Sequence, residues 1–568
     1  MSAKPEPRLK VVLCWHMHQP QYFDLESGQY QLPWTYLHAI KDYVDMAAII
    51  EDVPGARAVV NFAPTLLEQL DDYAQMVRDY LQHDTPLRDP LLAALVTAAP
   101  PSDPEQRLLL IRNCLRANEM RLIDRFPQFR LLADLARCVE ETPRLVSYLD
   151  EQFLTDLLTW YHLAWIGETV RRTDSRVQDL MDKNAAFTHA DRRQLLELIG
   201  ELLDGVVPRY RRLAEGGRVE LSVTPYAHPI MPLLLDIDAA RDAMPEARLP
   251  LLTEYPGGEA RARWHVREGI RVFEQHFGTK PRGCWPSEGG VSTDTISLLA
   301  EEGFAWAASG ESVLRNSMHR HCVAGHGCIH RPYQVDGADL QCYFRDDGLS
   351  DLIGFTYANW HADDAVGNLI HHLENIATAC ADEPNRVVSI IMDGENAWEY
   401  YPENGYHFLS ALYRRLATHP GLELTTFGDC IDAGLSPTVL PGLVAGSWVY
   451  GTFSTWIGET DKNHAWDLLG EAKRAFDAAV AAGRLSGTRL REAELQLGVC
   501  EGSDWFWWFG DYNPADSVRD FERLFRMQLA KLYRVMGEEP PDTITHVLFH
   551  GGGKPQMGGV MRRGQEGS

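Results

Sequence analysis

The chain combines two hydrophobic patterns, short apolar runs that end in polar residues and longer stretches with helical spacing. Short apolar or β-branched runs are typical of buried strands, and apolar residues three or four positions apart are typical of helices. Strands are predicted at 11–15, 56–62, 218–224, 281–285, 304–308, 340–344, 387–392 and 422–427. Their alternation with helical stretches favours an α/β fold wound as a barrel, with seven or eight parallel strands.

The helical stretches are unevenly distributed and suggest how the chain is divided. A barrel domain is predicted over residues 1–435, with a helical insertion at about 66–212. Beyond it the strand pattern fades, so a C-terminal helical domain is expected over 436–545. The glycine- and charge-rich residues 546–568 are expected to form a flexible tail.

Composition and charge narrow the classes of partner. The chain has 54 Lys and Arg against 80 Asp and Glu, and its formal charge of −26 repels phosphate backbones and anionic membrane surfaces. We therefore expect neither nucleic acid nor membrane as a partner. Residues 1–10 lack the apolar core of a signal peptide, and the ten cysteines include no CxxC pair. Reduced thiols in a cytoplasmic protein are predicted, and the oligomeric state stays open.

Two carboxylates that follow predicted strands carry the main chemical signal. Glu288 follows a Gly-Cys-Trp-Pro-Ser strand end, and Asp393 ends the strand predicted at 387–392. The carboxyl ends of parallel strands share one mouth, so these side chains can converge and act as the carboxylate pair of a retaining glycosidase. The alternative interpretations are a helix-start Glu and a turn-forming Asp-Gly pair. Glu395 and Glu399 compete with Asp393 on spacing alone.

His16 and His18 alternate with Met17, so on an extended chain they point to the same face. They fit hydrogen bonding to a sugar or one half of a metal site, but no HExxH motif or further ligand with fixed spacing completes such a site. Sugar binding is favoured over metal binding, and a structural hydrogen bond is the third possibility. No cofactor is expected to be required, and a structural calcium stays open.

Tryptophans gather beside acidic residues, most densely in Ser503-Asp-Trp-Phe-Trp-Trp508. Aromatic planes suit the apolar C–H faces of sugar rings, and neighbouring carboxylates accept hydroxyl protons. The cluster is therefore interpreted as part of an oligosaccharide groove, with packing in a core as the alternative. Trp456 lies in a similar, shorter segment.

Five segments resemble, in the right order, the five sequence regions of glycoside hydrolase family 57. They are His18-Gln-Pro20, Gly217-Arg-Val-Glu-Leu-Ser222, Gly283-Cys-Trp-Pro-Ser-Glu288, Met392-Asp-Gly-Glu-Asn396 and Ser503-Asp-Trp-Phe-Trp-Trp508. The resemblance implies an incomplete, seven-stranded relative of the TIM barrel, with a helical C-terminal region that supplies the last motif. It also implies a retaining mechanism with the third-region Glu as nucleophile and the fourth-region Asp as acid/base, which selects Asp393 over Glu395.

Within that family, the last region resembles the amylopullulanase and α-amylase group most. The function expected is hydrolysis of α-1,4 or α-1,6 bonds in glycogen, starch, pullulan or maltodextrins. The alternatives are a 4-α-glucanotransferase or branching enzyme, a metal-dependent mannosidase- or deacetylase-like enzyme, and a non-catalytic glucan-binding protein. The expected substrate-binding residues are His16, His18, Glu220, Trp285, Glu395, Trp456, Asp504, Trp505 and Trp508.

Overall fold

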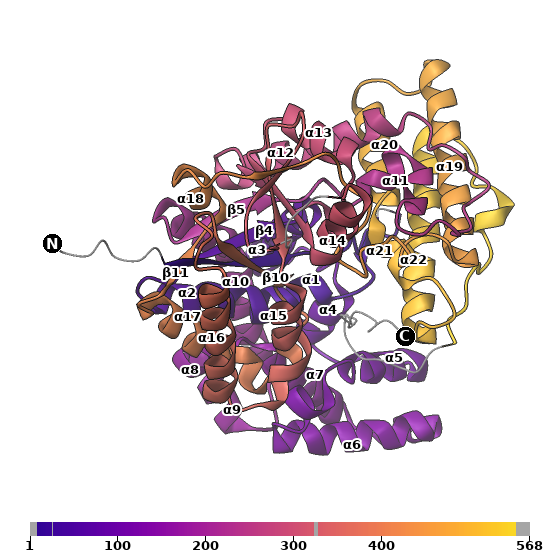
Figure 1. Cartoon of the computed structure of the whole chain (residues 1–568). Coiled ribbons are helices and arrows are strands. Elements are labelled where there is room, and N and C mark those ends of the chain that lie inside the picture. Colours follow the sequence, from indigo (N-terminus) through magenta and orange to yellow (C-terminus); the bar gives the residue numbers. More distant parts are fainter. Residues whose placement is uncertain (1–7, 25, 323–327, 553–568) are drawn as a thin grey trace.

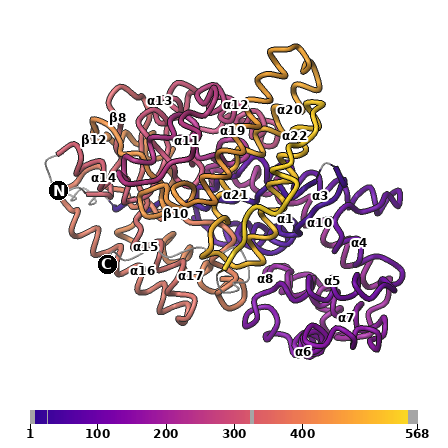
Figure 2. The backbone as a smooth tube through the Cα atoms, turned by 90° about the vertical axis from the view of Figure 1, so that its right-hand side faces the viewer, coloured from indigo at the N-terminus to yellow at the C-terminus, as the bar shows by residue number. Residues whose placement is uncertain are grey.

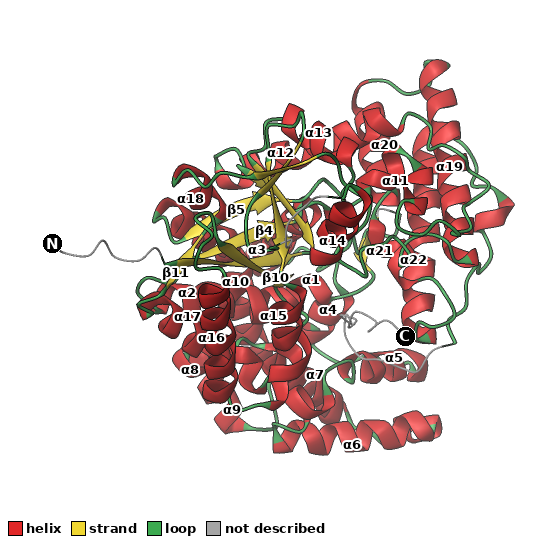
Figure 3. Ribbon diagram, in the orientation of Figure 1, coloured by secondary structure: helices red, strands yellow, loops and turns green. Residues whose placement is uncertain are grey.

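The computed structural model describes residues 8–24, 26–322 and 328–552, and within them a barrel of parallel strands lies at the centre (Figure 1). The barrel strands are β1 (Leu9–Met17), β4 (Ala58–Phe62), β5 (Val219–Val223), β6 (Gly283–Cys284), β7 (Trp306–Gly310), β9 (Gln341–Arg345) and β10 (Val387–Asp393). Each pairs with the next, and β10 returns to β1. Helices surround these strands (Figure 3), so the predicted seven-stranded β/α barrel is confirmed.

β10 pairs extensively with its neighbour on one side of the barrel, β1, and only briefly with its neighbour on the other side, β9. β1 and β10 pair continuously from Lys10 with Val387 to His16 with Asp393, which brings that histidine beside that carboxylate. In the described residues, β9 and β10 share one pairing, Ser389 with Arg345. The seam between β9 and β10 is therefore thin, as is the junction of β5 and β6, which share the single pairing of Val223 with Cys284.

Additional strands extend the sheet beyond the closed ring. The eighth predicted strand, β11 (Leu422–Thr425), pairs with the first half of β1 and lies outside the ring. β8 (Tyr333–Val335) pairs antiparallel with β9, and β12 (Thr438–Leu440) pairs parallel with β8. Because β8 and β12 are only three residues long, their apolar pattern is too short to predict. β12 carries the sheet past the expected end of the barrel domain at 435. A separate hairpin joins β2 (Phe23–Asp24) and β3 (Gln29–Tyr30).

The outer helices follow the strands in sequence. They are α1 (Trp34–His38), α2 (Val44–Asp52), α11 (Met231–Leu235), α12 (Gly258–Phe277), α13 (Thr293–Glu301), α14 (Glu311–Arg320), α15 (Asp347–Asp351), α16 (Ala362–Ala379), α17 (Tyr406–Thr418) and α18 (Phe427–Asp432). Their buried faces are apolar, as the helical spacing in the sequence indicates.

A run of helices between β4 and β5 forms the predicted insertion. It contains α3 (Pro64–His83), α4 (Pro90–Val96), α5 (Pro104–Cys114), α6 (Pro127–Glu141), α7 (Glu151–Trp165), α8 (Glu168–Thr173), α9 (Ser175–Lys183) and α10 (His189–Glu215). Proline begins the first four of these helices, where its missing N–H costs nothing. Figure 2 shows α5, α6 and α7 together on one side of the molecule.

The C-terminal region is helical as predicted, with α19 (Thr460–Ala481), α20 (Gly487–Cys500), α21 (Ser503–Trp508) and α22 (Ala515–Met536). Residue 549 of the flexible tail expected at 546–568 is packed on the fold. Phe549 is 2% exposed, and its ring centroid lies 4.4 Å from that of Phe509. Residues 553–568 of that predicted tail lie outside the described residues. In the part of the chain that is described, no helix is long and apolar enough to cross a membrane.

Candidate active site

A cavity of about 1280 Å³ opens at the carboxyl ends of the barrel strands. His16 and His18 reach it from the end of β1, Glu288 from the turn after β6, and Asp393 from the end of β10. The cavity therefore brings together the two carboxylates and the histidine pair that the sequence singled out. Glu395 also lines it.

Glu288 is held in an uncommon backbone conformation beside two tryptophans. Its φ of 56° and ψ of 25° lie in the left-handed region, which residues other than glycine rarely adopt. The Trp448 indole N–H donates to Glu288 Oε2 at 3.0 Å. The next residue, Gly289, has a φ of 58°, and a Cβ there would lie 3.0 Å from Trp285 and 3.2 Å from Trp448. The turn therefore needs glycine for close contact with the tryptophans.

The two carboxyl groups favour the retention of a proton. Burial raises the pKa of Asp393 to about 6, against the opposing effect of a hydrogen bond from Asn396. Burial also raises the pKa of Glu288 well above its ordinary value, and the negative charge of Asp393 adds to this effect. The negative charge of Asp393 opposes ionisation of Glu288, so the pair favours a state that retains one proton.

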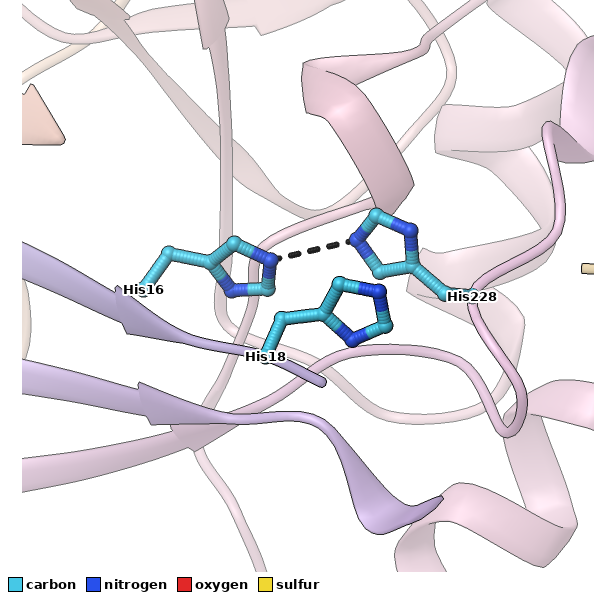
Figure 4. Close-up of side chains that lie close together, drawn as sticks. All are labelled: His16, His18 and His228. Carbon is cyan, nitrogen blue, oxygen red and sulfur yellow. Dashed lines mark hydrogen bonds between the residues drawn. The ribbon is translucent and has the colours of Figure 1, made fainter. Parts of the chain in front are cut away.

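A third histidine joins the predicted pair (Figure 4). The Nε2 atoms of His16 and His228 lie 3.1 Å apart, and the His18 ring stacks on His228 at 3.9 Å between centroids. His228 lies in the loop after β5. The strand-end reasoning that singled out the other two histidines applies equally to the loop after 218–224, so this residue could have been found from the sequence.

Each of the three histidines also lies within hydrogen-bond distance of a polar side chain outside the group. His16 Nδ1 lies 2.6 Å from Asn61 Oδ1, and His228 Nδ1 lies 2.8 Å from Ser503 Oγ. His18 Nε2 lies 2.7 Å from Asp504 Oδ1. Each of these contacts fixes the orientation of one ring at the cavity.

The stacking of the three histidine rings affects whether they can bind one metal ion together. Burial lowers the pKa of His16 to about 3 and lowers that of His228 as well, so both rings are neutral near pH 7. Their ligand nitrogens and that of His18 lie within 4.8 Å of one another. However, the stacked rings of His18 and His228 are only 14° from parallel, so their in-plane lone pairs do not converge on one ion. The arrangement suits hydrogen bonding better.

Within the described residues, Glu395 forms its hydrogen bonds through one oxygen. Its Oε1 accepts hydrogen bonds from the backbone N–H of His18 at 3.2 Å, from Gln19 Nε2 at 3.1 Å and from the Tyr43 hydroxyl at 3.2 Å. Burial raises the pKa of Glu395 well above its ordinary value, and the charge of Asp393 adds to this effect. This residue lines the cavity and also orients the segment that carries His18.

Four of the residues expected to contact sugar do not line the cavity and need correction. Trp285, Trp456 and Trp505 are 0%, 0% and 1% exposed. Their rings are packed in the interior because large aromatic side chains stabilise most where they are fully buried. Glu220 is the second residue of β5 and lies at the end of the strand away from the cavity. There it accepts hydrogen bonds from the Trp306 indole at 2.7 Å and from a backbone N–H of α18 at 2.8 Å. These partners satisfy its carboxylate inside the fold.

Asp504 and Trp508 lie at the cavity as expected, on α21. Trp508 stacks on Phe521 of α22 at 4.9 Å between centroids and 19° between planes. Trp507, which belongs to the predicted cluster but was not named individually, also lines the cavity, and sequence reasoning missed Trp448, which lines it as well. Trp448 lies in an irregular segment with no periodic pattern, so nothing local distinguished it from a core tryptophan.

Comparison with known proteins agrees with this architecture. A sequence model of glycosyl hydrolase family 57 matches residues 12–441. The structure is similar to a GH57 branching enzyme from Thermococcus kodakaraensis (14% identity, 93% of this chain and 90% of that chain, TM-score 0.57). It is also similar to the α-amylase AmyC from Thermotoga maritima (14% identity, 94% and 93%, TM-score 0.56). A 4-α-glucanotransferase from Thermococcus litoralis matches at 13% identity (93% and 60%, TM-score 0.51). These structural similarities establish the fold.

Proposed function

The chain belongs to glycosyl hydrolase family 57, and we propose on this basis that it is a retaining enzyme acting on α-glucans, with Glu288 as nucleophile and Asp393 as acid/base. One observation carries the proposal. Two carboxyl groups from the ends of different strands line one large cavity, and burial raises the pKa of both. Such a pair is what double displacement at a sugar carbon requires.

In the proposed reaction, the Glu288 carboxylate attacks the anomeric carbon while Asp393 donates its proton to the glycosidic oxygen, which leaves with the departing sugar. Asp393 then takes a proton from water as the water displaces Glu288 from the glycosyl-enzyme. The attack requires the ionised form of Glu288. The hydrogen bond from the Trp448 indole N–H favours that form and opposes the larger effect of burial.

Sugar binding is proposed for the histidines, Asp504, Glu395 and the exposed tryptophan faces of the cavity. Trp448, Trp507 and Trp508 offer planes against which sugar C–H groups can pack. The α-glucan class is supported by the activities of the similar structures, an α-amylase, a branching enzyme and a 4-α-glucanotransferase. We propose hydrolysis of α-1,4 bonds, α-1,6 bonds or both, as in the amylopullulanase and α-amylase group, in the cytoplasm and without a required cofactor.

Transfer of the glycosyl unit to a second sugar is the other candidate. It uses the same covalent intermediate, intercepted by a hydroxyl of an acceptor glucan rather than by water. The similarity to a branching enzyme and to a 4-α-glucanotransferase supports this second candidate.

The test is product analysis after separate incubation with pullulan, amylose, glycogen and maltoheptaose. Net release of reducing ends supports hydrolysis, and maltotriose from pullulan identifies α-1,6 cleavage. Longer and shorter products from maltoheptaose with little gain in reducing ends identify transfer instead.

Glu288→Gln should eliminate all products while retaining the fold and glucan binding. Near-normal turnover by this variant would remove Glu288 from the nucleophile role.

The metal-dependent alternative is tested in the same assay. Activity should persist after dialysis against a chelator, because the proposed chemistry is carried by carboxyl groups. Loss of activity on chelation and its recovery on addition of a divalent metal would contradict the proposal.

A further inference from the structure

A second cluster of potential metal ligands lies outside the cavity lining and consists of Cys328, His330 and Cys380. The first two residues precede β8, and Cys380 follows the last residue of α16. The two Sγ atoms lie 3.6 Å apart, and Cys380 Sγ lies 4.0 Å from His330 Nδ1. All three ligand atoms lie within 4.8 Å of one another.

These separations are close to those of a tetrahedral zinc site. Zinc bonds of about 2.3 Å to sulfur and about 2.0–2.1 Å to nitrogen place neighbouring ligand atoms roughly 3.5–3.8 Å apart. The Sγ–Sγ distance of 3.6 Å falls in this range, and the Sγ–Nδ1 distance of 4.0 Å exceeds it by a few tenths of an ångström. Small side-chain rotations are therefore sufficient to close the site.

The orientation of His330 provides an independent argument. Its Nε2 lies 2.9 Å from Asp346 Oδ2, which leaves Nδ1 directed towards the thiols. Asp346 is itself fixed, because its Oδ1 accepts a hydrogen bond from the Leu349 backbone N–H at 2.8 Å. A carboxylate on the far nitrogen is the usual partner of a metal-binding histidine, since it fixes the tautomer and the ring plane.

Without a metal, His330 carries the positive charge of the cluster. Burial opposes ionisation of Cys328, but hydrogen bonds with His330 and Cys380 outweigh it and lower the pKa of the thiol to about 7. Burial likewise opposes protonation of His330, yet Asp346 and the thiols raise its pKa to about 10. The His330 ring lies between the thiols and the Asp346 carboxylate.

We propose that Cys328, His330 and Cys380 bind a zinc ion, with water in the fourth position. Two thiolates and one imidazole are soft and borderline ligands that favour zinc over calcium or magnesium. Binding displaces the remaining thiol protons and the proton on His330 Nδ1, so the affinity should increase with pH.

The position of the cluster assigns the metal a structural role. The His330 carbonyl accepts from the Val387 backbone N–H at 2.9 Å, at the start of β10. The backbone N–H of Asp346 donates to the Ser389 carbonyl at 2.8 Å, across the thin seam between β9 and β10. An ion held by this cluster therefore connects the end of α16 to both strands of the seam and should stabilise the closed barrel.

The experiment measures metal content and thermal stability of the whole protein after reduction, dialysis against a chelator and addition of Zn²⁺. We expect binding of a single equivalent and an increase in melting temperature. Cobalt in place of zinc should give a thiolate-to-cobalt absorption band, which histidine ligands alone do not produce. Cys380→Ser should lose the band and the zinc-dependent stabilisation. Cys138→Ser removes an exposed cysteine elsewhere and should retain both.

Absence of the cobalt band in the unsubstituted protein, or an unchanged band in Cys380→Ser, would overturn the proposal. A disulfide between Cys328 and Cys380 in protein purified without reductant, seen as the mass loss of two hydrogens, with no zinc uptake after reduction, would also overturn it. These outcomes do not depend on glycosidase activity, so the zinc site and the proposed function fail or stand separately.

Discussion

At the scale of single residues, the site depends on how Glu288 is held. A left-handed conformation at a residue with a Cβ costs on the order of 1 kcal/mol and persists only where neighbours enforce it. Trp448 does so twice, since its backbone N–H donates to the Glu288 carbonyl at 3.1 Å and its indole N–H donates to the carboxylate at 3.0 Å. Trp448 therefore positions the proposed nucleophile and favours its ionised form.

Trp448→Phe should retain the backbone contact and remove the indole donor. A hydrogen bond to a charged group contributes about 1.5–3 kcal/mol, so kcat/KM should fall about tenfold or more. Loss of the donor also raises the pKa of Glu288, and the acidic limb of the kcat/KM profile should move to higher pH. The pH profile provides the measurement. Trp360→Phe, at a tryptophan that is 43% exposed, is the matched control. A fall in activity with no shift of the acidic limb would contradict this role.

Glu288→Gln should be inactive and yet more stable than the unsubstituted protein at neutral pH. The folded-state pKa of Glu288 is raised well above its ordinary value by burial, so the folded protein binds this proton more tightly than the unfolded chain does. The stabilisation from this proton is complete below the unfolded pKa and is lost as pH rises through the folded pKa. Glutamine carries no such dependence.

Thermal melts at pH 8 and pH 4 provide the measurement for this substitution. The variant should melt higher at pH 8 by on the order of one degree or more, and the difference should shrink towards pH 4. Equal melting temperatures at both pH values would show that burial does not destabilise the Glu288 carboxylate.

At the scale of elements, the sequence predicted the strands and the polar residues at their carboxyl ends, since a buried strand has an apolar run and a polar end. Glu288, Asp393 and His18 were found in this way. Trp285 and Trp456 were assigned wrongly because a tryptophan beside a carboxylate has the same sequence pattern in a core and in a groove. Only the packing of distant elements distinguishes the two cases, and no local pattern encodes that packing.

One buried ion pair joins the C-terminal helices to the barrel helices. Glu501, which follows α20, accepts hydrogen bonds from Arg261 at 2.7 Å and from the Tyr255 hydroxyl at 2.6 Å, and its Oε2 lies 2.7 Å from His265 Nε2. Burial raises the pKa of this carboxyl, but the Arg261 charge and the His265 hydrogen bond outweigh it and lower the pKa to about 2. The pair lies two residues before α21, which carries Asp504 to the cavity.

Glu501→Gln should destabilise the protein by about 3–5 kcal/mol, because it leaves the Arg261 charge buried without a counter-charge. Denaturant unfolding at pH 7 is the measurement. Glu259→Gln is the control, since Glu259 pairs with Arg263 at 3.1 Å with its side chain 74% exposed, and its loss should cost less than about 1 kcal/mol. Similar losses for the two variants would contradict a structural role for the buried pair.

At the scale of the whole molecule, three distant parts of the chain build one cavity. The insertion contributes Leu109 and Arg116, the barrel contributes the carboxylates, and α22 contributes Phe521. Arg116 also forms an ion pair with Asp520 on α22, so the insertion and the C-terminal helices meet directly. The cavity therefore extends from the carboxyl groups to the junction of the insertion and the C-terminal region.

Trp508→Ala should then weaken long substrates more than short ones. Trp508 lies at the end of α21 and stacks on Phe521 of α22, so we expect a sugar against its exposed face to be bound on the α22 side of the cavity. Removing an aromatic contact of about 0.5–1.5 kcal/mol should raise KM for maltoheptaose about two- to tenfold, with kcat little changed. KM for a short maltooligosaccharide that does not reach α22 should stay constant. Equal effects on both substrates would mean that Trp508 supports the fold and does not bind the glucan.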